Sequence, residues 1–87
     1  MKSMIYCLYD SKIEAYLQPF FLKNKGEAMR GFNDLANDPK TAICKYAEDF
    51  TLFELGSYED ESAKFTLYST PISIGKAIEF KKVVAND

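Results

Sequence analysis

DFTLFELG, residues 49–56, and KFTLY, residues 64–68, predict a β-hairpin around which the rest of the chain can be arranged. The first arm is bulky and aromatic and the second alternates polar with apolar residues, which is typical of β-strands. Residues 57–63 between them are mostly polar and contain three consecutive acids, as expected of a solvated turn. We therefore place an antiparallel strand pair at the centre of the fold.

The alternation of side chains assigns the residues of this hairpin to two faces. Phe53 and Leu55 share one face, and Phe65 and Leu67 join it from the second arm. The opposite face holds large side chains without charge: Phe50, Leu52, Tyr58 and Tyr68. Because neither face is polar, we expect this second face to be covered as well. The cover is another part of the chain, a second copy of the protein or a ligand that stacks on aromatic rings.

The composition predicts one small soluble domain. The chain has 87 residues, of which 47% are hydrophobic and 15% aromatic, so it is too apolar to be disordered. Its apolar runs are short compared with a membrane span, and no secretory signal pattern precedes the first predicted strand. We expect a single domain over residues 1–87 with a frayed tail from about residue 83.

No pattern of a catalytic or metal site is found in the sequence. Histidine and glycine-rich phosphate loops are absent, and Cys7 and Cys44 are too far apart for a close metal-binding pair. We expect both thiols to be reduced and buried. The acids between Glu48 and Glu61 are candidates for a small hydrolase, but a charge run beside a turn is typical of a solvated face. The sequence therefore predicts a protein that is not an enzyme and carries no cofactor or metal.

The segments before the hairpin predict two strands and a helix. Residues 4–9 are apolar and rich in β-formers, as in a central strand buried on both faces. Residues 15–22 form an edge strand or an ordered loop, because Pro19 cannot donate to a sheet ladder. Asn24 is a helix cap supported by Glu27. The helix should end before Pro39, and its apolar stripe is Ala28, Met29, Phe32, Leu35 and Ala36.

Two segments fit more than one structure. Residues 41–47 fit a short helical turn or a loop. Ser69–Pro71 is expected to break the second hairpin arm, and residues 72–80 then fit a short helix capped by Ser73 or, less well, a strand. The predicted fold class is α+β, with a small antiparallel sheet packed on one main helix. The element order is roughly β-β-α-β-β, followed by a short C-terminal helix.

Motifs along nearly the whole chain carry a family resemblance. They are IYxxYD at 5–10, AYxxPFF at 15–21, AMRxF at 28–32, NDP at 37–39, AEDFTLFELG at 47–56 and PxxxxxAI at 71–78. The most specific is EDFxLxxLG at 48–56, which an acidic turn follows. Together they resemble the small non-structural protein of gokushoviruses, Microviridae bacteriophages with circular single-stranded DNA. Relatives often have a proline where this chain has Ala47, a difference that bears on the stiffness of the loop.

The resemblance implies a DNA-binding accessory protein that acts in single-stranded DNA synthesis or packaging, in the cytoplasm of the infected bacterium. It brings no catalytic motif. From the residues, aromatic side chains and cations occur close together between Tyr16 and Arg30. We predict that Lys23, Lys25 and Arg30 contact phosphates and that Tyr16 or Phe20 stacks on a base, weakly because the net charge is −2. The alternative is a homodimeric module that binds a viral or host protein through the apolar sheet, and no membrane partner is expected.

Overall fold

The computed structural model describes residues 1–82, and its centre is a five-stranded antiparallel sheet. The strands are β1 (Lys2–Asp10), β2 (Ala15–Tyr16), β3 (Phe20–Leu22), β4 (Phe50–Glu59) and β5 (Lys64–Lys76). Their order is β2-β1-β4-β5, and β3 also pairs with β1. The helices are α1 (Lys25–Asn37), α2 (Ala42–Lys45) and α3 (Ala77–Phe80). The predicted α+β class is confirmed, and the segment around Pro19 is divided into two short edge strands.

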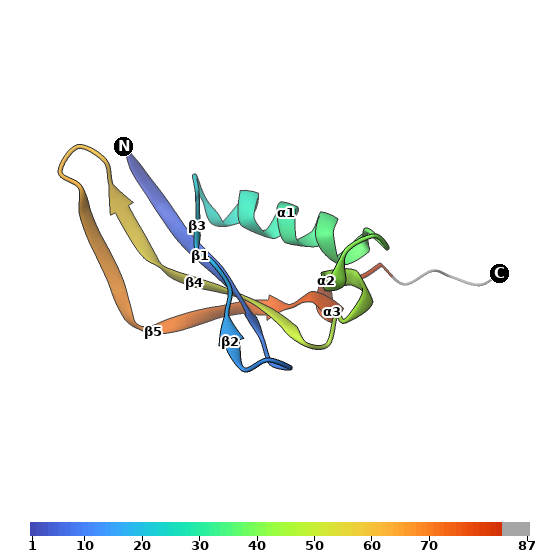
Figure 1. The fold of residues 1–87 in the computed structure, drawn as a ribbon. Coiled ribbons are helices and arrows are strands. Elements are labelled where there is room, and N and C mark those ends of the chain that lie inside the picture. Colours follow the sequence, from blue (N-terminus) through green and yellow to red (C-terminus); the bar gives the residue numbers. More distant parts are fainter. Residues whose placement is uncertain (83–87) are drawn as a thin grey trace.

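The sheet is curled, and α1 lies along its concave side (Figure 1). β1 is the central strand that the sequence predicts, with Ile5 to Leu8 buried. Tyr6 and Leu8 belong to the core beneath α1, whereas Ile5 and Cys7 point to the opposite side of the sheet. No helix within residues 1–82 has the length and hydrophobicity needed to cross a bilayer.

Helix α1 begins and ends where its capping residues predict. The side chain of Asn24 accepts a hydrogen bond from the Glu27 amide (3.0 Å), and the Glu27 carboxylate accepts one from the Lys23 amide (3.1 Å). Asp38, before Pro39, is the extended C-terminal cap. The predicted apolar stripe is wider than the buried one, because Met29 and Leu35 lie at its margins and are exposed.

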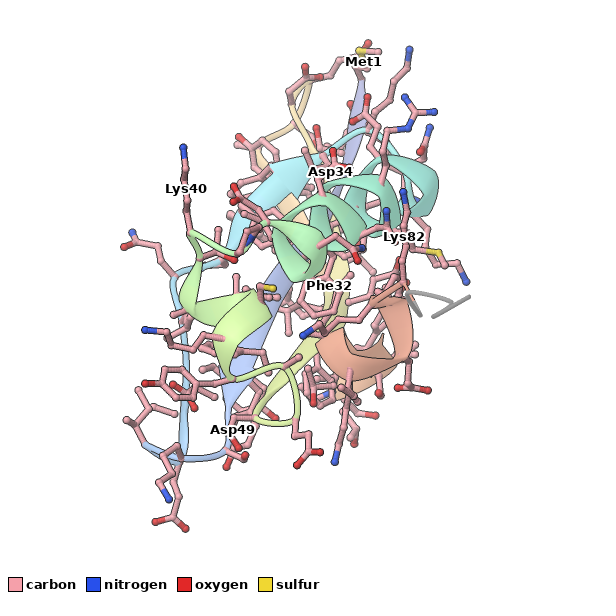
Figure 2. The ribbon with its side chains drawn as sticks, turned by 90° about the vertical axis from the view of Figure 1, so that its right-hand side faces the viewer. Met1, Phe32, Asp34, Lys40, Asp49 and Lys82 are labelled. Carbon is pink, nitrogen blue, oxygen red and sulfur yellow. The ribbon has the colours of Figure 1, made fainter. Side chains whose placement is uncertain are left out.

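The core lies between α1 and the concave face of the sheet. Small side chains at Ala28 and Ala36 let the helix approach the strands. Phe32, labelled in Figure 2, is buried between the helix and the sheet. Phe32 also meets Phe80 of α3 edge-on, with ring centroids 5.1 Å apart. Phe50 and Leu52 of β4 are in this core. The cover expected over this side of the hairpin is therefore α1, a part of the same chain.

The hairpin differs from the prediction because β4 contains an irregularity. β4 continues to Glu59, so the turn is limited to Asp60–Ala63. The register shifts between Glu54 and Gly56, which leaves Leu55 as an extra residue. Gly56 has φ +149°, and a Cβ atom there would collide with the Thr66 carbonyl oxygen. The shift moves Tyr58 to the opposite face from Leu52, so the predicted placement of Tyr58 is wrong.

β5 is longer than predicted. Ser69–Pro71 does not end the strand but lies in a stretch without ladder partners, between Leu67 and Ile72, where β5 turns a corner in Figure 1. Pro71 is tolerated because this is an edge strand. The favoured helix capped by Ser73 is wrong, since residues 72–76 continue the strand and α3 begins only at Ala77. Residues 42–45 form the short helix α2, and the predicted tail from residue 83 lies outside the described residues.

Candidate nucleic-acid interface

The side of the sheet opposite α1, here called the outer face, is defined by the strand register. Its rows are Tyr16, Tyr9, Thr51 and Lys76; Cys7, Phe53 and Ser73; Phe21, Ile5, Gly56 and Leu67; and Ser3, Tyr58 and Phe65. α1 packs on the other side of the sheet (Figure 1). The outer face is therefore the apolar surface of the described chain that lacks a covering helix.

One group of rings, triad A, lies where β1 ends. It consists of Tyr9, Tyr16 and Phe53, from β1, β2 and β4. The ring centroids of Tyr9 and Tyr16 are 4.7 Å apart, and that of Phe53 lies 5.5 Å from Tyr16 and 6.4 Å from Tyr9. These distances are typical of interacting aromatic pairs. The short strand β2 matters here because it brings Tyr16 to the other two rings.

A second group, triad B, lies toward the hairpin tip. It consists of Phe21, Tyr58 and Phe65, from β3, β4 and β5. Tyr58 and Phe65 have centroids 4.7 Å apart, and Phe21 lies 5.9 Å from Tyr58 and 6.5 Å from Phe65. Tyr58 joins this group only because of the register shift at Leu55, so the irregularity in β4 assembles triad B.

Between its rings the outer face holds two buried side chains, while three of the rings are exposed. Ile5 and Cys7 are only 3% and 2% exposed, although no helix lies above them. By contrast Tyr16, Phe21 and Phe65 are 51%, 48% and 54% exposed. The outer face thus has a small core of its own among its rings. Leu67, in the row of Ile5, is not part of this core and is 62% exposed.

The charges of the molecule are distributed unevenly around the outer face. None of the Asp and Glu residues in the described chain falls in its register rows, and Lys76 lies in the row of Tyr9 and Thr51. Lys23 is exposed and follows β3, two residues after Phe21. Glu54 and Glu59 are paired in rows of the concave side instead. No row of the outer face therefore contains a carboxylate, in a protein whose net charge is −2. Two carboxylates lie beside its lysines, since the Lys76 amide donates to Glu79 (2.6 Å) and the Lys23 amide to Glu27 (3.1 Å).

The structure separates the residues of the predicted DNA site. Tyr16 lies on the outer face in triad A, whereas Phe20 is partly buried on the concave side, 6.0 Å from the Tyr6 ring. Lys23 precedes α1, and Lys25 and Arg30 are exposed on the helix. Sequence reasoning missed Phe21, the neighbour of Phe20 that does point outward. The pairing of Ile5 with Phe21 decides which of the two adjacent phenylalanines is accessible.

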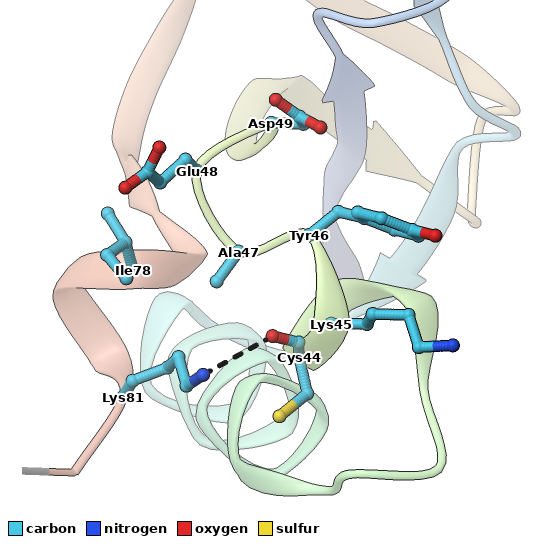
Figure 3. A pocket seen from close by; sticks show the side chains of 8 residues that line it. All are labelled: Cys44, Lys45, Tyr46, Ala47, Glu48, Asp49, Ile78 and Lys81. Atoms are coloured by element: carbon cyan, nitrogen blue, oxygen red, sulfur yellow. Dashed lines mark hydrogen bonds between the residues drawn. The ribbon is translucent and has the colours of Figure 1, made fainter.

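The acids considered for a hydrolase are spread along the molecule. Glu59 and Asp60 at the hairpin tip contact the N-terminal ammonium group, and Figure 2 places Met1 and Asp49 at opposite ends of the structure. Glu48 and Asp49 line a cavity of about 280 Å³ beside α2 and α3, but their carboxylates point in different directions (Figure 3). Within residues 1–82 no three metal-ligating side chains lie together. This arrangement does not converge on a reacting atom.

The two cysteine thiols and two tyrosine hydroxyls are further candidates for reactive groups. The Cys7 and Cys44 thiols are free. Cys7 is buried as expected, which raises the pKa of its thiol, whereas the expectation of a buried thiol is wrong for Cys44, which is partly exposed. On the concave side, the Tyr68 hydroxyl donates to the Glu54 carboxylate (2.8 Å). Burial, followed by the charge of Glu54, raises the pKa of Tyr6 to about 12, and the Tyr6 hydroxyl has no hydrogen-bond partner among the described residues. The Tyr68–Glu54 pair is exposed, and the Cys7 and Tyr6 side chains are buried.

The fold and the outer face define a small α+β protein with an accessible aromatic sheet. A model of the phage ORF5 protein family matches residues 3–80, which is nearly the whole chain. The chain therefore belongs to the phage ORF5 protein family. No curated protein and no solved structure matches it. The expectation of a bacteriophage protein is confirmed.

Proposed function

We propose that this protein is a non-enzymatic accessory protein of a gokushovirus that binds single-stranded DNA weakly, in viral DNA synthesis or packaging in the host cytoplasm. The observation that supports the proposal best is the outer face, where two triads of rings, with Tyr16, Phe21 and Phe65 exposed, lie in strand rows that contain no carboxylate. The motif resemblance to gokushoviruses supports the particular kind of phage.

The chemistry of single-stranded DNA fits such a surface. Unpaired bases stack on aromatic side chains, and stacking tolerates any sequence because every base has a π-face. Lys76 and Lys23 are exposed in or beside the rows that contain the rings, and they are candidates for phosphate contacts. With so few cations, a log–log salt slope of about −1 to −2 is expected, at roughly −0.7 per phosphate contact.

The absence of an enzymatic role is part of this proposal. It is supported by the spread of the acids over both ends of the molecule (Figure 2) and by a sequence without histidine. A binding function needs only the rings and a few cations, both of which the outer face supplies.

Fluorescence anisotropy with labelled oligothymidylate of about twelve nucleotides tests the proposal. The parent protein should bind more weakly at about 200 mM than at about 50 mM salt. The double variant Tyr16→Ala/Phe53→Ala should lose about 1 to 3 kcal/mol of binding free energy, the contribution of one base stacked on triad A. Tyr46→Ala is the matched control, because Tyr46 is an exposed ring (55%) outside the outer face. If the double variant binds as well as the control, the outer face is not the site.

A second candidate function is a homodimeric module that binds a viral or host protein. It is favoured by β5, which has no partner on its other side among residues 1–82 and exposes Phe65, Leu67 and Ile72. Light scattering at tens of micromolar protein tests it. A dimer that Leu67→Lys dissociates would support this function, and a monomer at every concentration would remove its main support.

A further inference from the structure

We infer that triads A and B are two separate stacking subsites for a single DNA strand, which hold two bases several nucleotides apart and leave the bases between them unread. This inference rests on the proposed function and deepens it, because it specifies the length and the pattern of the ligand. Its consequence is that binding depends on where the bases are along the strand as well as on how many there are.

The spacing of the triads follows from the register. Triad A occupies the β1 rows of Tyr9 and Cys7, and triad B occupies those of Ile5 and Ser3. The centres of the two triads are thus separated by four residues along β1, which corresponds to about 13 Å at roughly 3.3 Å per residue. At about 3.4 Å per nucleotide for a stacked strand, this distance spans about four nucleotide steps, and fewer if the strand is extended.

The triads are separate because their ring contacts are separate. The ring pairs of the outer face all join members of the same triad. Ile5 and Cys7, in the rows between the outermost rings, are almost completely buried and offer no ring for stacking. A base that stacks on Tyr16 is therefore a different base from one that stacks on Phe65.

Each triad also has a lysine beside it. Lys76 shares the row of Tyr9 and Thr51 near triad A, and Lys23 follows Phe21 of triad B by two residues. No carboxylate of the described chain falls in the rows between them. A polyanionic strand is the occupant that this distribution favours, because it gains a cation at each subsite and meets no acid between them.

Occupying both subsites with one strand makes the second stacking event intramolecular. A strand that carries bases only at its two ends should therefore bind better than one with the same bases side by side. Both strands carry the same number of phosphates, so the difference between them reports stacking geometry and not charge.

The experiment uses two labelled pentanucleotides with abasic sites. One carries thymine at its first and fifth positions, and the other carries thymine at its second and third positions. We expect the first to bind at least about fivefold more tightly, the gain from stacking one additional base at about 1 kcal/mol. Equal affinities, with clear binding of a longer oligothymidylate, would overturn the inference and leave the proposed function standing. If neither pentanucleotide nor the longer strand binds, both the inference and the proposed function are contradicted.

Variants assign the subsites. Phe21→Ala/Phe65→Ala, in triad B, should remove the preference for the strand with terminal bases. Tyr16→Ala/Phe53→Ala, in triad A, should remove the same preference. Tyr46→Ala should retain the preference. Circular dichroism checks that each variant is folded, and having one variant for each triad keeps the test decisive if one of them does not fold. A preference that survives in both double variants would contradict the two-subsite arrangement.

Discussion

The two faces of this sheet bury their apolar residues in different ways. The concave face is closed by α1, whose alanines at positions 28 and 36 allow a close approach. On the outer face Ile5 and Cys7 are buried among two groups of rings, of which Tyr16, Phe21 and Phe65 are about half-exposed. One face therefore stabilises the protein through a helix, while the other keeps aromatic surface accessible to a ligand.

β1 links the two faces, because its successive side chains enter both cores. Tyr6 and Leu8 pack beneath α1, and Ile5 and Cys7 lie among the rings. A small domain buries only a modest fraction of its surface. Here β1 contributes buried side chains to both sides of the sheet, although α1 packs on only one of them.

Removing a ring from the concave core should have the largest effect. Phe32→Ala is expected to lower the free energy of unfolding by about 3 to 5 kcal/mol, because Phe32 is buried between helix and sheet. Phe65→Ala on the outer face should cost less than about 1.5 kcal/mol, since that ring is already half-exposed. Urea unfolding measures both variants. Equal losses would show that the two faces do not differ as described.

Cys7 tests whether the outer face has a true core. Cys7→Ser should cost about 1 to 3 kcal/mol, because it places a hydroxyl in a buried apolar site, and Cys44→Ser at a partly exposed site should cost less. Burial also raises the pKa of the Cys7 thiol, so alkylation of Cys7 should be slower than that of Cys44. Rapid alkylation of Cys7 in the folded protein would show that the rings do not exclude solvent.

The substitution Tyr6→Phe should have the smallest effect on stability at neutral pH and a distinct effect at alkaline pH. Because its buried hydroxyl has no hydrogen-bond partner among the described residues, Tyr6→Phe should leave stability unchanged or raise it by about 1 kcal/mol.

The alkaline effect follows from the pKa of Tyr6. In the folded protein this pKa is about 12, above the ordinary value of 10.0, so the parent protein should lose stability as pH rises from 10 toward 12, where only the unfolded chain ionises. The variant should lose less over that range, as denaturant titrations at several pH values can show. A destabilising Tyr6→Phe at pH 7 would indicate a hydrogen bond to the hydroxyl.

Local signals were sufficient to predict part of this fold. The bounds of α1 follow from Asn24 and Pro39, and the apolar run of β1 indicates a strand buried on both sides. The course of β5 and the face of Tyr58 could not be obtained in this way. Both depend on the register between strands, in which Leu55 is an extra residue and β5 has no ladder partners between Leu67 and Ile72, and no single segment reveals that register.

The candidate site could be predicted only in part, because it too depends on how the strands pair. Tyr16 lies on the outer face, whereas its expected companion Phe20 packs toward α1 and the adjacent Phe21 is the accessible ring. A shift of one residue in register exchanges the two faces of a strand, and only the pairing with β1 settles that register. The rings of triad B come from three strands and are distant in sequence.

The central claim, that single-stranded DNA binds the outer face, is tested most directly by nuclear magnetic resonance. Isotope-labelled protein is titrated with a short oligothymidylate, and the shifts of backbone and aromatic-ring signals are followed. We predict that the largest changes occur at Tyr16, Phe53, Phe21 and Phe65, with small changes on the exposed side of α1 at Lys25 and Arg30. Changes concentrated on α1, with the outer-face rings unaffected, would contradict the claim.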